Sequence, residues 1–76
     1  MIFLLGLSAC GDHSTNYTLY RNSRDYPQMR IHVGSFDAAY QDSDYNRENC
    51  NIAADLFQAQ RGVKVKYWCE KGDFRG

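Results

Sequence analysis

The sequence has no excess of charge of either sign and no hydrophobic run long enough to cross a membrane. Lysine and arginine together number nine, as do aspartate and glutamate. Such a chain has no overall field that would draw it onto nucleic acid or an anionic membrane, so nucleic acid is not an expected partner and an electrostatic partner must meet a local patch. The apolar run from Ile2 to Leu7 is far shorter than the roughly twenty residues of a transmembrane helix.

Motifs for metal binding, redox chemistry and nucleophilic catalysis are also lacking. The three cysteines show no C-x-x-C spacing, and His13 and His32 lie far from any cysteine, which excludes the usual zinc and thioredoxin-like patterns. The D-x-D-x-N pattern beginning at Asp42 lacks the glycine and the glutamate of a calcium loop. No nucleophile stands in a glycine-bounded elbow, and so small a scaffold offers little room for a water-excluding cleft. We expect no enzyme, no cofactor and no metal.

The first ten residues have the features of an export signal. An apolar run ends in Leu7-Ser-Ala-Cys10, and the chain turns polar at Gly11. This ending resembles the lipobox of bacterial lipoproteins, in which the cysteine receives a diacylglycerol thioether and becomes the mature N-terminus. We therefore expect residues 1–9 to be a signal-like segment, Cys10 to carry the lipid that holds the chain to a membrane, and residues 10–16 to be a linker. The expected location is the periplasmic side of the bacterial envelope.

One feature departs from a normal signal. No lysine or arginine precedes the apolar run, and the run is short. Either the true start lies upstream of Met1, or the segment is not a working signal. The alternative is that Ile2 to Leu7 form a strand buried in the domain.

Length and cysteine content predict one disulfide-bonded domain over residues 17–76. With nine of the 76 residues removed, 67 remain, and a hydrophobic core of that size is only marginally stabilising without a cross-link. Assigning Cys10 to a lipid leaves Cys50 and Cys69 as a natural pair in an oxidising compartment. The alternative is two independent buried thiols.

Alternating apolar and polar residues predict three strands, over residues 17–21, 29–36 and 63–69. A helix is expected from about Tyr45 to Gln60, because Ser43 or Asp44 can cap its start and Gly62 can end it. This order predicts an α+β fold, β-β-α-β, with a small three-stranded, mainly antiparallel sheet and the helix on one face.

The same alternation divides the sheet into a buried face and an open face. The helix is expected to cover two apolar rows with its own Ile52, Leu56 and Phe57; the rows are Met29, Ile31 and Val33, and Val63, Val65 and Tyr67. The opposite face is expected to stay solvated and to carry Thr18 and a basic, aromatic candidate binding face, consisting of Tyr20, Arg30, His32, Lys64, Lys66 and Trp68. Such a face suits an anionic protein or envelope polymer. The alternative is a solvated sheet surface without a ligand.

Over most of its expected mature part, the chain also resembles an uncharacterised family of small exported, lipoprotein-like proteins of Gram-negative bacteria. The resemblance rests on residues 17–23, 29–33, 36–38, 45–46, 48–50 and 63–71, including Tyr67-Trp-Cys-Glu70. It implies export and an α+β fold, and it carries over no catalytic residue. The expected function is a binding or interaction module without catalytic activity. The alternatives are a purely structural periplasmic protein, or an inhibitor or small hydrolase of the envelope.

Overall fold

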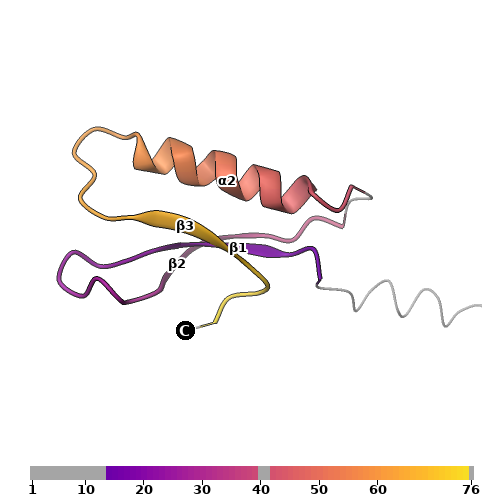
Figure 1. The fold of residues 1–76 in the computed structure, drawn as a ribbon, viewed down its shortest axis with the longest axis horizontal. Coiled ribbons are helices and arrows are strands. Elements are labelled where there is room, and N and C mark those ends of the chain that lie inside the picture. Colours follow the sequence, from indigo (N-terminus) through magenta and orange to yellow (C-terminus); the bar gives the residue numbers. More distant parts are fainter. Residues whose placement is uncertain (1–13, 40–41, 76) are drawn as a thin grey trace, which may run out of the picture.

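A computed structural model describes residues 14–39 and 42–75. These residues form β1 (Tyr17–Arg21), β2 (Ile31–Phe36), α2 (Tyr45–Gln58) and β3 (Tyr67–Lys71), in that order (Figure 1). The strands make one antiparallel sheet in the order β2-β1-β3. The predicted α+β fold is confirmed. The signal-like segment, the lipid site at Cys10 and the alternative strand at residues 2–7 lie outside the described residues.

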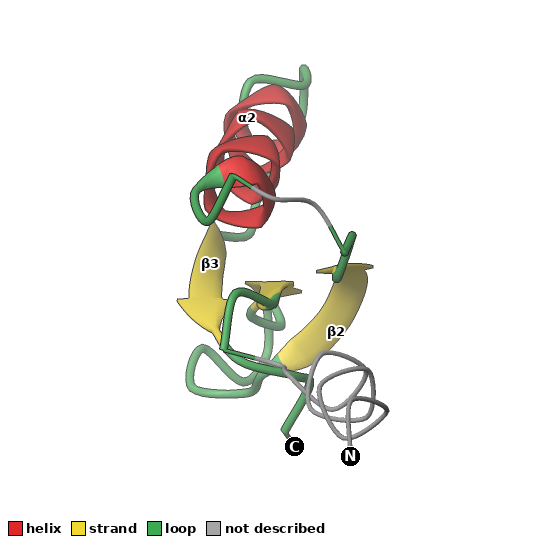
Figure 2. Cartoon of the chain, turned by 90° about the vertical axis from the view of Figure 1, so that its right-hand side faces the viewer, coloured by secondary structure: helices red, strands yellow, loops and turns green. Residues whose placement is uncertain are grey.

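The sheet is one layer, with α2 across one face and the residues that follow β3 across the other (Figure 1). Viewed along the strands, α2 lies over β3, and β2 lies at the opposite edge of the sheet (Figure 2). The central strand β1 is covered on both faces, because Thr18, Leu19 and Tyr20 are each at most 1% exposed. No residue of β2 is fully buried.

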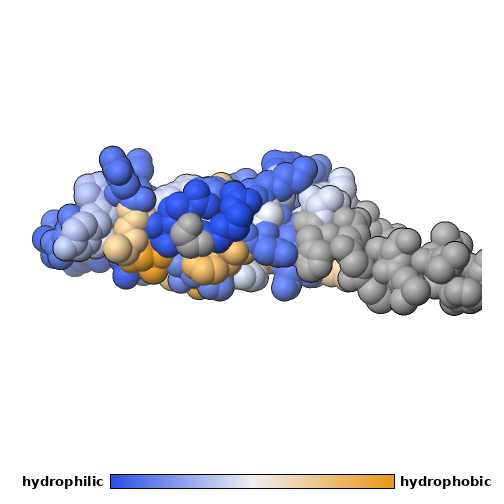
Figure 3. Space-filling view, turned by 90° about the horizontal axis from the view of Figure 1, so that it is seen from below, coloured by the Kyte–Doolittle hydropathy of each residue, from blue (hydrophilic) through white to orange (hydrophobic). Residues whose placement is uncertain are grey.

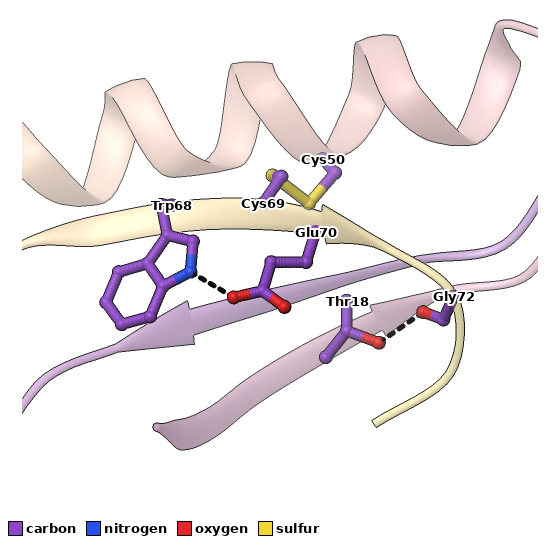
Figure 4. The surroundings of a disulfide bond; sticks show 6 residues. All are labelled: Thr18, Cys50, Trp68, Cys69, Glu70 and Gly72. Carbon is purple, nitrogen blue, oxygen red and sulfur yellow. Dashed lines mark hydrogen bonds between the residues drawn. A yellow bond between two sulfur atoms is a disulfide. The ribbon is translucent and has the colours of Figure 1, made fainter. Parts of the chain in front are cut away.

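The core beneath α2 is small and contains the disulfide. Leu19 of β1 meets Cys50 and Ala54 of α2 there, and Phe57 stacks on Tyr67 of β3 with 5.2 Å between ring centroids. Cys50 is bonded to Cys69 of β3, and their Cα atoms lie 6.2 Å apart (Figure 4). The predicted disulfide is confirmed.

Part of the predicted core is wrong. Ile52 and Leu56 are 57% and 60% exposed, and Met29 is 46% exposed. The apolar arc of α2 is wider than the surface that a three-stranded sheet offers, so only its part around Cys50 and Ala54 reaches the core. Met29 precedes β2 and lies in the loop that leads into that strand.

The third strand begins four residues later than predicted. The helix ends at Gln58, Gly62 has a positive φ of 83°, and the chain needs residues 59–66 to return to the sheet. The Gln58 side chain holds this return: its amide donates to the Val65 carbonyl and its oxygen accepts from the Tyr67 amide, both at 2.8 Å. Val63 and Val65 therefore lie in a loop, not in a strand row.

A register shift in β2 breaks the strict alternation on which the predicted faces depend. Leu19 lies opposite Gly34, but Tyr20 lies opposite His32, so Val33 is the extra residue of a β-bulge. As a result His32 and Ser35 share a face, and His32 Nε2 lies 2.9 Å from Ser35 Oγ.

A buried amide fixes the start of α2. Asp44 occupies the predicted N-cap position, but its side chain makes no capping hydrogen bond. The Asn46 side chain, which is 3% exposed, donates to the Ala38 carbonyl and accepts from the Ala38 amide, both at 3.0 Å. This two-way contact ties the loop after β2 to the helix.

Candidate functional site

The predicted solvated face of the sheet is covered at its centre by the C-terminal residues. Gly72, at φ +106°, reverses the chain after β3. Its amide then donates to the Asn16 carbonyl at 2.7 Å, and its carbonyl accepts from Thr18 Oγ1 at 2.8 Å (Figure 4). Thr18 and Tyr20 are consequently buried, so the prediction that they face solvent is wrong.

An aromatic cluster fills this side of the sheet. The ring of Tyr20 stacks on Trp68, with centroids 5.8 Å apart, and lies 5.9 Å from Phe74. Phe74 in turn stacks on His32 at 4.7 Å. The Tyr20 hydroxyl accepts from the Arg75 amide at 3.0 Å and donates to the Arg75 carbonyl at 3.4 Å. The cluster is a second small core, and its outer surface is formed by His32 and Phe74.

Glu70 connects the charged groups of this cluster, although it was not among the residues of the predicted binding face. Its carboxylate accepts from Trp68 Nε1 at 2.7 Å (Figure 4). It also accepts from Arg30 Nη2 at 2.6 Å, and Arg75 Nη2 lies 3.6 Å away. The two-residue spacing from Trp68 places Glu70 on the same face, so the strand pattern contained this signal. Because Arg30 is paired, its charge is largely neutralised within the protein.

Hydrogen bonds shift the pKa of two ionisable groups in this cluster. Burial raises the pKa of the Tyr20 hydroxyl, but the Arg75 amide and the Arg30 guanidinium lower it by more, so this pKa lies below its usual value. The hydrogen bond to Tyr20 raises the pKa of Arg30, and Glu70 adds to that effect. The guanidinium, whose Cζ lies 4.7 Å from the Tyr20 centroid, therefore stays charged.

The six residues of the predicted binding face separate into two groups. Tyr20, Arg30, His32 and Trp68 lie together in and around the aromatic cluster. Lys64 and Lys66 do not join them, because both lie in the loop before β3. The face that carries the cluster is mostly hydrophilic with small hydrophobic areas (Figure 3).

Lys64 and Lys66 belong to a basic end of the domain. The loop between β1 and β2 and the loop between α2 and β3 both lie at this end of the domain (Figure 1), and hydrogen bonds between Asn22 and Lys66 join them at 3.1 and 2.9 Å. We define the basic end by the cationic residues located there: Arg21, Arg24, Arg61, Lys64 and Lys66. Asp25 is the only acidic residue in loops 22–30 and 59–66.

The cations of the basic end are available to a ligand. All except Arg21 are exposed. None of the five appears in an ion pair among the described residues, where the paired cations are Arg30, Arg47 and Arg75. Sequence reasoning found Lys64 and Lys66 but missed Arg21, Arg24 and Arg61, because only the fold places the two loops at the same end of the domain.

The opposite end of the domain is acidic. The segment from the end of β2 to the first turn of α2 carries Asp37, Asp42, Asp44 and Glu48, against Arg47 alone, and Arg47 is paired with Asp44 at 3.2 Å. Tyr17, the first residue of β1, lies opposite Phe36 at this same end. A chain of zero net charge is thus polarised along its strands.

Residues 14–39 and 42–75 contain neither a metal-binding cluster nor a membrane-spanning helix. No group of three or more histidine, cysteine, aspartate or glutamate side chains there is arranged to hold a metal ion. Within the same residues, no helix has the length and apolar character needed to cross a membrane.

Comparisons of this chain with protein-family models, with curated proteins and with solved structures found no match. Its function must therefore be inferred from its own surfaces.

Proposed function

We propose that this chain is a non-catalytic binding module of the bacterial envelope, anchored through a lipid on Cys10, whose basic end recognises the carboxylate or phosphate groups of an anionic partner. The separation of charge along the domain supports this proposal above all. The lipobox-like Leu7-Ser-Ala-Cys10 and the resemblance to small exported proteins support the export and the anchor. The Cys50–Cys69 disulfide suits an oxidising compartment.

The arrangement of the two ends suits a tethered binding module. Cys10 precedes β1 by seven residues, a linker that spans at most about 25 Å when extended. Because β1 starts at the acidic end, that end would lie nearest the membrane. The basic end, at the other end of the strands, would then point away from the membrane toward a partner.

Exposed cations without internal partners favour the basic end over the aromatic cluster as the binding site. Tyr20 is 1% exposed, and Arg30 is already bonded to Glu70. An anion at the cluster would have to compete with that carboxylate. At the basic end, Lys64 and Lys66 are exposed, and a ligand gains the full benefit of their charge.

Charge reversal at the basic end should weaken binding to anionic polymers by about tenfold at low salt. The variant is Lys64→Glu, and the probes are fluorescently labelled polyglutamate and polyphosphate, followed by anisotropy. Lys71→Glu is the matched control, because it changes the net charge equally and Lys71 is an exposed residue opposite Tyr17, at the acidic end. Equal affinity of the two variants would contradict the proposed site.

Replacement of the lipid-bearing cysteine should release the protein from membranes. In cells, Cys10→Ser should move the chain from the membrane fraction to the soluble periplasmic fraction and abolish its labelling by palmitate. Two or more acyl chains are needed for firm anchoring, so the parent protein should resist a high-salt wash. If the Cys10→Ser variant also resists that wash, the chain is held by something other than a lipid.

A further inference from the structure

One side of α2 carries large apolar residues that the domain does not bury. Ile52 is 57% exposed, Leu56 is 60% exposed and Tyr45 is 39% exposed. A helix that packs on a sheet normally turns such residues to the core. Several of them exposed together on one helix side mark a surface for interaction.

This side of α2 faces the β2 edge of the sheet. At the start of the helix, Tyr45 and Asn49 line a recess together with Ser35 and Phe36 of β2. Farther along the same side of the helix, Ala53, Leu56, Phe57 and Gln60 line a second recess of about 340 Å³. Since α2 lies over β3 (Figure 2), the two recesses form a groove beside the helix on its β2 side.

The spacing along this groove is that of a helix-packing seam. Tyr45 and Asn49 line the first recess, Leu56 lines the second, and Ile52, one turn before Leu56, is exposed. These four residues follow one another at intervals of four, three and four, the spacing by which one helix packs lengthwise against another. From Tyr45 to Leu56 the seam rises about 16 Å. Its shape therefore fits a second helix laid alongside α2 better than a compact ligand.

The upper rim of the groove is acidic. Glu48 and Asp55 lie seven residues apart on the side of the seam away from the sheet, and both are exposed. Neither is in an ion pair within the residues that the structure describes. The lower rim, β2, carries no aspartate, glutamate, lysine or arginine. A partner that matches both rims brings an apolar stripe with basic residues along one side of it.

A second copy of this chain fits the groove poorly. If two α2 helices packed antiparallel through this seam, Glu48 of one would face Asp55 of the other at both ends of the contact. Like charges in such flanking positions disfavour pairing. The acidic rim thus selects a different partner.

From the exposed seam and its acidic rim, we propose that the groove between α2 and β2 binds an amphipathic helix of another protein, with lysine or arginine beside its apolar stripe. This surface is separate from the basic end, and the proposal does not depend on the anionic partner proposed above.

Two synthetic helical peptides with the same leucine stripe test the proposal, one flanked by lysine and the other by glutamate. The lysine-flanked peptide should shift the amide resonances of Ile52, Ala53 and Leu56 in the disulfide-bonded protein. It should bind at least about tenfold more tightly than the glutamate-flanked peptide at low salt, and salt should reduce that difference. Equal binding, binding elsewhere or no binding of either peptide would overturn the proposal.

Substitutions at the surface separate this groove from the other surfaces. Leu56→Gln should weaken binding of the lysine-flanked peptide by about tenfold or more, because a buried leucine contact is lost. Asn51→Gln, on the exposed polar side of the same helix, is the matched control and should leave binding unchanged, as should Lys64→Glu. If the protein instead dimerises in analytical ultracentrifugation and Leu56→Gln abolishes the dimer, the groove is a self-association surface and the proposal is wrong.

Discussion

Replacing both Cys50 and Cys69 by alanine is expected to lower the free energy of unfolding by about 3 kcal/mol. The disulfide closes a loop across a sequence separation of 19, and in the chain-entropy model a loop of this size restricts the unfolded chain by about that amount. The bond also joins α2 to β3 through a core that contains few fully buried apolar side chains, Leu19 and Ala54 beside Cys50. The remaining packing beneath the helix comes from partly buried side chains such as Tyr17, Val33 and Phe36.

Urea unfolding of the oxidised parent and of the double variant measures this effect. In a domain of this size, a loss of about 3 kcal/mol should also lower the melting temperature by more than about 10 °C. Cys10→Ser is the control and should match the parent, since Cys10 takes no part in the bond. A double variant that unfolds at the urea concentration of the parent would show that helix packing alone stabilises the domain.

Local patterns were sufficient to predict the elements and the disulfide. The bounds of β1 agree with the alternation in residues 17–21, and α2 begins at Tyr45 as its capping residues indicate. The start of β3 could not be predicted in this way, because Val63 and Val65 alternate like strand residues. They lie in the loop because Gln58 bonds to Val65 and Tyr67 across the turn, a contact that depends on where the helix ends in space.

The two faces of the sheet were harder to predict than its strands. Alternation cannot reveal the bulge at Val33, which shifts the pairing of β2 with β1. It also cannot reveal that the residues after β3 fold back over Thr18, since that reversal depends on Gly72 contacting residues more than fifty positions away. Both effects are tertiary, and together they turned a predicted open face into a covered one.

Much of the candidate site also depends on tertiary contacts that local sequence patterns do not reveal. The sequence marked Lys64 and Lys66 as basic, but the basic end exists because the fold places the loop that carries Arg24 at the same end of the domain and joins the two loops at Asn22 and Lys66. The sequence also showed a broad apolar arc on α2. How much of that arc the core would use depended on the width of the sheet, and the unused part became the groove beside β2.

Truncating Tyr20 should destabilise the domain more than any single substitution on its surface. Tyr20→Ala removes a side chain that is 1% exposed and that contacts Trp68 and Phe74, so we expect a loss of about 3–5 kcal/mol. Tyr20→Phe keeps the ring and removes the hydroxyl with its hydrogen bonds to Arg75, which should cost about 1 kcal/mol. Tyr26→Ala, at a tyrosine that is 65% exposed, is the matched control and should cost less than about 0.5 kcal/mol.

Urea unfolding, followed by the fluorescence of Trp68, distinguishes a sheet face that the C-terminal residues cover from one that is open to solvent. If the C-terminal residues cover it, the three variants should follow the order Tyr20→Ala, Tyr20→Phe, Tyr26→Ala in decreasing destabilisation. Because a loss of 3–5 kcal/mol approaches the whole stability of a small domain, Tyr20→Ala could be unfolded without denaturant, and Tyr20→Phe then carries the comparison. If Tyr20→Phe and Tyr20→Ala both unfold like Tyr26→Ala, Tyr20 faces solvent. In that case Tyr20 would return to an open binding face beside Arg30, His32 and Trp68.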